Sequence, residues 1–259
     1  MTITIAVINK STLVSDADVA LMAAACEFQI VKHVAPLSNR GAWHVKAFSA
    51  TDELPSECVS IVIMDDPDQA NALGYHMDGT TGACGRVFVR PILHWGGSVL
   101  SGPLSVSAVL SHEVCETFCD KSTNMWIDRM DGTLVALEVC DPVENDSYEV
   151  CVTRADGIVV PVSVSNFVLY SWFNAFAPAG TRFDYLGNVK EPLTMSSGGY
   201  VVVLDYMNGE VTEVFGSKEA QKLHKQKKPH GDGSRSLKRQ GRQKKHSDNR
   251  NHDKHSKKN

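Results

Sequence analysis

Hydrophobic residues in the N-terminal part of the chain follow two different periods. Residues 3–8 form a short β-branched apolar run, and residues 43–48 and 59–64 alternate or run apolar, as strands do. Residues 16–29 fit a helix instead, with Ser15 as its N-cap. The pattern therefore predicts an α+β chain in which strands and helices are interleaved.

Further strands and turns are predicted along the rest of the chain. Residues 65–85 are rich in Gly, Asp and Thr and predict a long loop around a short helix, and residues 86–92 predict a core strand. The dipeptides Asp156-Gly157 and Asn208-Gly209 are typical of hairpin turns. They join two predicted hairpins, 148–153 with 157–162 and 200–204 with 210–215, and a short helix is predicted at 165–175.

One helix combines a hydrophobic stripe with a chemically distinct opposite face. Between residues 103 and 120, apolar side chains recur every four positions and form one stripe at about 100° per residue. These residues are Val106, Leu110, Val114 and Phe118. His112 and Glu116 point roughly the opposite way, with Asp120 one turn further on.

The polar face of this helix contains the motif H-E-x-x-E. In zinc peptidases the related H-E-x-x-H motif places two metal ligands one turn apart, with a glutamate that activates water. Here His112 and Glu116 have the ligand spacing, and Glu113 has the position of the general base. The alternative is an amphipathic helix whose solvated face happens to contain these residues, because such four-residue matches also occur by chance.

An acidic cluster after the predicted strand at 132–137 could complete a site. A catalytic zinc ion needs three protein ligands and one open position, so His112 and Glu116 would be joined by Glu138 or Asp141. The alternatives are a solvated acidic loop, or a turn that begins at Asp141-Pro142. One imidazole and two carboxylates also suit Ca²⁺, Mg²⁺ or Mn²⁺, so a structural ion with no open position stays open beside zinc.

Cys119 and Asp120, at the end of the same helix, are candidates for positions next to the metal ligands. The seven cysteines are odd in number and form no C-x-x-C pair, which predicts reduced thiols in a protein made in a cytoplasm. Cys119 shares a helix face with His112 and is the strongest thiolate candidate, although a small buried hydrophobe is the alternative. Asp120 and Cys119 are therefore candidates for positions next to the ligands.

Charge divides the chain into two parts. Residues 217–259 contain 15 basic and 4 acidic residues, a net charge of +11, which leaves −15 for residues 1–216. The tail has almost no large apolar side chain, which predicts disorder and nonspecific contact with nucleic acid or with acidic protein surfaces. We expect one folded domain at 1–216. The sequence predicts no membrane contact, because no run approaches the ~20 apolar residues of a membrane helix.

Four segments together resemble a family of tailed-bacteriophage proteins that are virion-associated or uncharacterised. The matching segments are Ser111 to Asp120, Leu137 to Glu144, Val164 to Val168 and Pro192 to Tyr200, within a resemblance that covers about residues 1–216. The chain is also distantly similar to bacterial zinc peptidases with an H-E-x-x-E-x-x-x-D-P helix. It departs from them at Lys121, where they have proline, and at His94, where an acidic or amide residue is expected.

These resemblances imply a zincin-like mixed sheet with a metal-carrying helix, β-hairpins and a basic tail. They imply His112, Glu116 and Glu138 or Asp141 as ligands of Zn²⁺ or another divalent cation, and Glu113 as the base. The resulting hypothesis is a phage-encoded peptidase that hydrolyses peptide bonds with metal-activated water, in the host cytoplasm or the virion. The alternatives are a non-catalytic virion component, which contacts other virion proteins on the same scaffold, and a nucleic-acid-associated protein that acts through its tail.

Overall fold

The N-terminal half of the chain forms a five-stranded sheet with the strand order β2-β1-β3-β5-β4. The computed structural model describes residues 3–38, 41–68, 72–78 and 84–227. The first four strands in this order are parallel, and β4 is antiparallel to β5. The strands are β1 (Ile3–Asn9), β2 (Trp43–Ser49), β3 (Cys58–Met64), β4 (Gly74–His76) and β5 (Gly85–Phe88).

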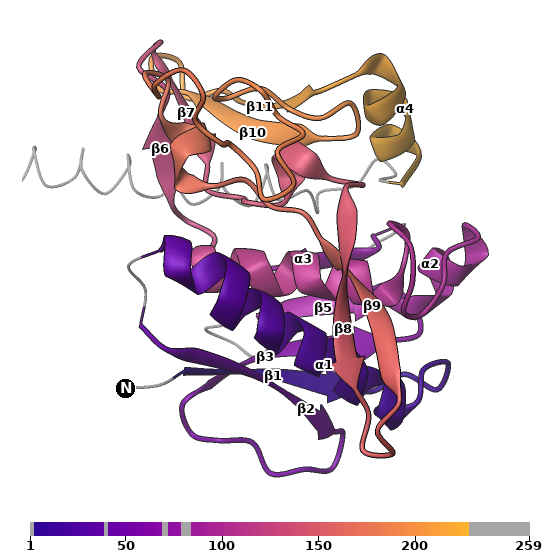
Figure 1. Cartoon of the computed structure of the whole chain (residues 1–259). Helices are drawn as coiled ribbons and strands as arrows, with labels where there is room; N and C mark the ends of the chain where they lie inside the picture. The colour runs from indigo at the N-terminus through magenta and orange to yellow at the C-terminus, as the bar shows by residue number, and fades with distance from the viewer. Residues whose placement is uncertain (1–2, 39–40, 69–71, 79–83, 228–259) are drawn as a thin grey trace, which may run out of the picture.

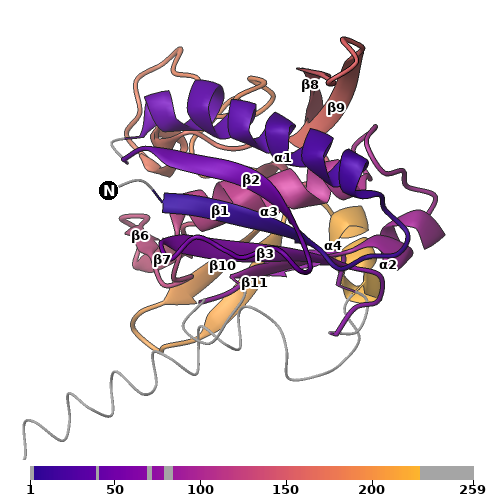
Figure 2. The ribbon, with the colours of Figure 1, turned by 90° about the horizontal axis from the view of Figure 1, so that it is seen from below.

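Two helices cover one face of this sheet. They are α1 (Asp16–Gln29) and α3 (Val106–Cys119), and both lie on the same side of the strands (Figures 1 and 2). Alternate residues of β1 explain the arrangement, because Ile5 and Val7 belong to the main core with the helices, whereas Ala6 and Ile8 belong to a small cluster on the opposite face.

The C-terminal half packs on the other side of α3. A four-stranded antiparallel sheet with the order β11-β10-β7-β6 lies above the helices in Figure 1, and the hairpin β8–β9 packs against α1 and α3. Its strands are β6 (Trp126–Asp128), β7 (Thr133–Ala136), β10 (Tyr200–Asp205) and β11 (Val211–Phe215), and those of the hairpin are β8 (Ser147–Thr153) and β9 (Val159–Ser165).

Helix α3 is consequently central rather than half-solvated. Every residue in it except Val109 and His112 is buried. The alternative of a solvated polar face was wrong, because strand β4 packs against α3, and Glu113 and Glu116 are buried. The polar residues of α3 are therefore enclosed in protein and need internal partners.

Most of the predicted elements are present. Helix α1 has the expected bounds, and Ser15 Oγ accepts a hydrogen bond from the Asp18 amide. Both hairpins form, with Gly157 and Gly209 at positive φ in their turns. The fold is α+β as expected, while the zincin-like arrangement stays a prediction.

Three elements differ from the prediction. The strand expected at 86–92 ends at Phe88, because helix α2 (Val89–His94) begins there. The helix expected at 165–175 is a short 3₁₀ turn, Tyr170–Phe173. Within 65–85, a short helix was expected in a loop, but the described residues contain strand β4 and no helix. These segments are short, so their local pattern does not separate strand from helix.

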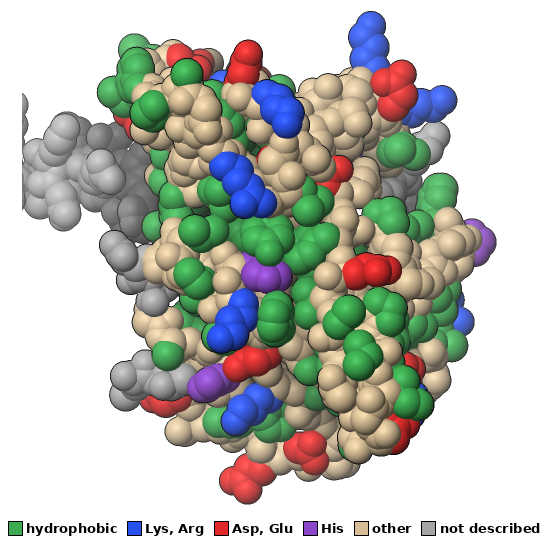
Figure 3. Space-filling model, viewed as in Figure 1, with side chains coloured by type: hydrophobic (Ala, Val, Ile, Leu, Met, Phe, Trp, Pro, Cys, Tyr) green, Lys and Arg blue, Asp and Glu red, His purple; other side chains and the backbone are tan. Residues whose placement is uncertain are grey.

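The surface shows no single-sign field on the side drawn in Figure 3. Acidic and basic side chains are interspersed there with apolar ones over the described residues. In the described part of the chain, the helices are all too short or too polar to cross a bilayer.

The start of the basic tail is ordered, which differs from the disorder expected from Ser217 onward. Residues Lys218–Lys227 form helix α4 next to β11, and residues 228–259 lie outside the described residues. Ala220 is buried, and the His224 ring lies 4.5 Å from the Tyr200 ring and 5.0 Å from the Phe215 ring. Aromatic stacking and one buried methyl group thus attach a segment that composition alone assigns to a disordered tail.

Two truncations should separate these parts. Ending the chain at Lys227 should leave the melting temperature unchanged, whereas ending it at Gly216 should lower it by about 2–6 °C, since about 1–1.5 kcal/mol of aromatic contact is lost. Both truncations should abolish retention of DNA or RNA, and retention by the full chain should fall steeply with salt. Calorimetry and binding measured over a salt series test both expectations. Retention that survives truncation at Lys227 would move the binding surface to the folded domain.

Candidate metal centre

Helix α3 begins at an N-cap and carries His112, Glu113 and Glu116 of the motif. Ser105 Oγ accepts a hydrogen bond from the Ala108 amide at 3.1 Å, which fixes the start of α3. His112 and Glu116 are four residues apart and Glu113 and Glu116 three apart, so Glu116 is a neighbour of both on the helix surface.

His112, Glu116 and Asp141 form the first half of the centre. The Nε2 atom of His112 lies 3.1 Å from Glu116 Oε1 and 3.1 Å from Asp141 Oδ1. Asp141 opens a 3₁₀ turn, Asp141–Val143, that follows strand β7. The turn after β7 thus places the Asp141 carboxylate next to His112 on the motif helix, as the acidic cluster in the sequence predicted.

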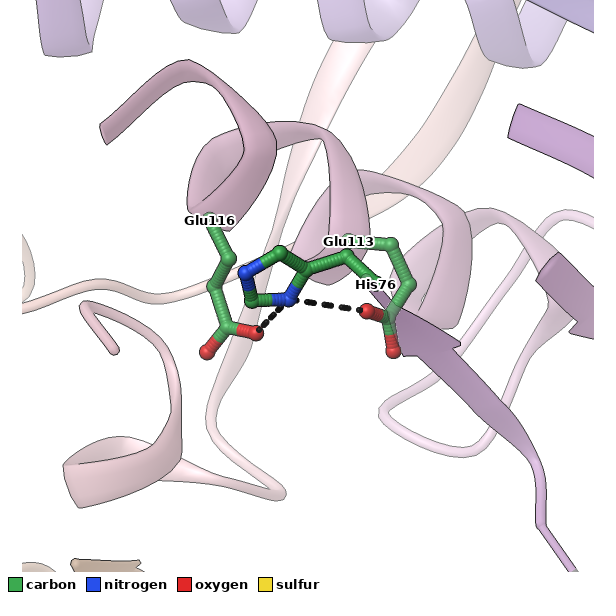
Figure 4. Close-up of side chains that lie close together, drawn as sticks. All are labelled: His76, Glu113 and Glu116. Atoms are coloured by element: carbon green, nitrogen blue, oxygen red, sulfur yellow. Dashed lines mark ion pairs between the residues drawn. The ribbon is translucent and has the colours of Figure 1, made fainter. Parts of the chain in front are cut away.

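His76 forms the second half and was missed at the level of sequence. It comes from β4, and its Nδ1 atom lies 3.1 Å from Glu116 Oε2 and 3.7 Å from Glu113 Oε2 (Figure 4). Its Nε2 atom lies 3.5 Å from Glu138 Oε2. A three-residue strand inside a Gly- and Asp-rich segment has no periodic signal, so only the tertiary fold identifies this histidine.

The two predicted third ligands therefore have different neighbours. Asp141 contacts His112, whereas Glu138 contacts the far nitrogen of His76. The sequence left Glu138 and Asp141 as alternative ligands, whereas in the structure they lie beside different histidines.

The cluster is almost completely enclosed. Side-chain exposure is 0% for His76 and Glu116, 3% for Glu113 and Glu138, and 1% for Asp141, while His112 keeps 13%. Four carboxylates beside two imidazoles at such burial carry an excess of negative charge, which is costly unless cations compensate it. His112 is the one ligand candidate of the cluster that solvent reaches to an appreciable degree.

The pKa values of His76 and His112 are both raised by the neighbouring carboxylates. Burial lowers the pKa of His76, but the carboxylates of Glu138, Glu113 and Glu116 outweigh it and raise the pKa to about 10. Burial likewise lowers the pKa of His112, yet Glu116 and Asp141 contribute to raising it well above the usual value. The cluster therefore favours positive charge at both histidines.

The arrangement could hold a divalent metal ion. In each of the groups His76–Glu113–Glu116 and His112–Glu116–Asp141, one donor atom per residue lies within 4.8 Å of the others. Ligands about 2.0–2.2 Å from one zinc ion lie at most ~4.4 Å apart, so small side-chain movements would close either group around an ion. Neither ring nitrogen of His76 makes a hydrogen bond of normal geometry, although both are buried.

Comparison with known proteins adds nothing to this geometry. No protein-family model, curated protein or solved structure matches the chain. The phage family and the zinc-peptidase similarity stay predictions.

The two residues expected next to the ligands have other surroundings. Cys119 is 1% exposed and belongs to the hydrophobic core. Asp120 Oδ2 accepts a hydrogen bond from the Met125 amide at 2.8 Å, across the turn that follows α3. Neither belongs to the two ligand groups found among the described residues, so the structure favours a packing role for Cys119 and a turn-stabilising role for Asp120.

Gly199 allows the backbone to pass very close to the turn that carries Asp141. A Cβ atom at Gly199 would lie 2.0 Å from the Pro142 carbonyl oxygen and 2.5 Å from its carbon, and this backbone cannot move aside like a flexible side chain. The same oxygen accepts a hydrogen bond from the Ser196 amide at 3.0 Å. The close approach of β10 to this turn therefore requires glycine.

Gly199→Ala should displace the turn and with it Asp141. We expect a loss of about 1–3 kcal/mol in stability from the overpacking and a loss of about tenfold or more in metal affinity. Calorimetry and metal titration measure the two effects. Gly41→Ala is the matched control, since no atom lies within 4 Å of a Cβ placed there. Unchanged metal affinity in Gly199→Ala would show that the turn does not position a ligand.

Proposed function

We propose that the protein is a metal-dependent hydrolase that cleaves peptide bonds, with the ion held by His112, Glu116 and Asp141. The observation that carries the proposal is the convergence of this trio around a common position, with Glu113 next to it on the same helix. Zn²⁺ is the first candidate because imidazole and carboxylate ligands at a three-ligand site are typical of zinc hydrolases.

The residues around the ion have complementary roles. An ion bound there would polarise a carbonyl group and water. Glu113 is adjacent to the ligands and would accept the proton from water during attack, as general bases do within hydrogen-bonding reach. The 13% exposure of His112 places the solvent-reachable side of the cluster at this trio.

The position of β4 supports a peptide as the substrate. β4 ends the strand order β2-β1-β3-β5-β4 and carries His76. A strand at the end of a sheet can pair with an extended peptide through its backbone. By contrast, β5 pairs with β3 and β4, so its Val87 and Phe88 belong to a core strand.

A structural ion is the second candidate, and the burial of the cluster favours it. Glu116 and Asp141 are 0% and 1% exposed, which suits a closed site that fastens the two sheets to α3. In this alternative the protein is a non-catalytic virion component. Mn²⁺, Mg²⁺ or Ca²⁺ would then compete with Zn²⁺ for the carboxylate-rich ligand set.

Metal analysis of the purified full chain tests the shared basis of both candidates. We expect bound metal in the wild-type protein and its loss in Glu116→Ala, with Glu149→Ala, an exposed glutamate on β8, as the control. Cleavage of fluorescently labelled casein that stops with a chelator and returns with Zn²⁺ supports the hydrolase. A metal-binding protein without any chelator-sensitive cleavage favours the structural ion, and a protein without metal overturns both.

The cellular setting is a further proposal that rests on sequence. The resemblance to tailed-bacteriophage proteins supports a place in the host cytoplasm or the virion. The charge of +11 on residues 217–259 supports nonspecific contact with nucleic acid or with acidic virion proteins.

A further inference from the structure

The two oxygens of Glu116 face two different histidines. Oε1 lies 3.1 Å from His112 Nε2, and Oε2 lies 3.1 Å from His76 Nδ1. Each histidine is accompanied by a further carboxylate, Asp141 at His112 and Glu113 at His76. Glu116 is thus shared by two ligand groups, each with one imidazole and two carboxylates.

We propose that the centre binds two divalent cations, bridged by the Glu116 carboxylate. The first ion is the one bound by His112, Glu116 Oε1 and Asp141, so the inference rests on the proposed function for that ion. The second ion is bound by His76 Nδ1, Glu116 Oε2 and Glu113 Oε2. Carboxylate-bridged pairs of ions about 3.5–4 Å apart clamp both oxygens that take part in a displacement.

The charge of the cluster supports two ions rather than one. Four carboxylates contact the two histidines, those of Glu113, Glu116, Glu138 and Asp141. The cluster therefore has twice as many acidic as basic side chains, and a second divalent ion beside His76 would offset the excess that an ion at His112 leaves.

Glu138 has a defined part in this arrangement. It contacts His76 from the side of Nε2, at 3.5 Å, while Nδ1 faces Glu113 and Glu116. Metal-bound histidines usually donate the proton of their other ring nitrogen to a carboxylate or carbonyl, and Glu138 has the position for this role once Nδ1 binds an ion. His76 is 2% exposed, and neither ring nitrogen makes a hydrogen bond of normal geometry, so the side chain is aimed into the cluster.

Glu113 faces the second ion group with one oxygen and strand β4 with the other. Oε2 faces His76 and the second ion, and Oε1 lies toward Gly74, 2.9 Å from where a Cβ of that residue would be. Val109 Cγ1 of α3 would lie still closer to that Cβ, at 2.7 Å, so α3 packs tightly on β4 at this glycine, two residues before His76.

Metal stoichiometry tests the proposal on the full chain. The protein is stripped with a chelator, equilibrated by dialysis with Zn²⁺ or Mn²⁺, and analysed by mass spectrometry of the elements. We expect His76→Ala and His112→Ala each to lose one equivalent and Glu116→Ala to lose two. His94→Ala, an exposed histidine on α2, should lose none. Because five histidines lie in residues 217–259, the readout is the difference from wild type, in which any metal bound by the tail cancels.

A spectroscopic measurement keeps the test independent of how the variants fold. Titration of the stripped wild-type protein with Mn²⁺ should give an electron paramagnetic resonance signal of a coupled pair that saturates at two equivalents. Loss of one equivalent in His112→Ala with no loss in His76→Ala, and an uncoupled signal, would overturn the second ion and leave the proposed function intact. Absence of any specific ion would overturn both, so the two failures are distinguishable.

Discussion

Removal of the bound metal should lower the melting temperature by on the order of 10 °C. An ion that binds only the folded state at about 1,000 times its Kd contributes about 4 kcal/mol, and a domain of this size shifts by about 2–4 °C per kcal/mol. The physical reason is that the carboxylates of Glu113, Glu116, Glu138 and Asp141 lie close together and almost fully buried. Without the ion, their mutual repulsion increases.

Calorimetry with and without a chelator checks this expectation, and readdition of Zn²⁺ or Mn²⁺ should restore the original transition. The control is Glu116→Ala, whose melting temperature should be insensitive to the chelator because its ligand set is broken. A wild-type transition that does not respond to the chelator would mean that the cluster is stable without a bound ion.

Glu113→Gln should reduce peptide cleavage by about 10²–10⁴-fold, the usual contribution of a general base. Glutamine has nearly the same shape as glutamate but cannot accept the proton, so the fold should be preserved. The ion bound by His112, Glu116 and Asp141 should stay in place, because Glu113 does not belong to that group. Cleavage of labelled casein, measured with metal content on the same preparation, gives both readouts.

Glu149→Gln is the matched control, since Glu149 is exposed on β8 and far from the motif in sequence. If Glu113→Gln cleaves as well as the wild type, Glu113 is not the base, and its contact with His76 is structural. If the variant loses all of its metal, Glu113 is needed to assemble the entire centre.

Local signals predicted the elements that depend on neighbours in the sequence. Helix α1 begins after Ser15 because the Ser15 hydroxyl oxygen accepts a hydrogen bond from the Asp18 amide. A serine at this position predicts such an N-cap from the sequence alone. The two hairpins turn at Asp156-Gly157 and Asn208-Gly209 because glycine adopts a positive φ without strain. Such preferences act over a few residues and need no knowledge of the fold.

The tail shows how such signals fail. Composition assigns residues 217–259 to a single basic segment, yet Lys218–Lys227 form α4 because the ring of His224 meets the rings of Tyr200 and Phe215. Those partners belong to the second sheet and cannot be inferred from the charge of the tail.

By itself, the sequence determined the part of the metal centre that lies on one helix. With 3.6 residues per turn, any helix there places Glu116 beside both His112 and Glu113. Only the tertiary structure decided what surrounds them. His76 lies on a three-residue strand and reaches Glu116 through the antiparallel pairing of β4 with β5. Asp141 reaches His112 from the 3₁₀ turn that follows β7, and the polar face of α3 is buried by segments distant in the sequence. The period of apolar residues in the sequence depends on the geometry of a single helix. Which residues are buried, and which act as ligands, depends on the distant segments that pack against that helix.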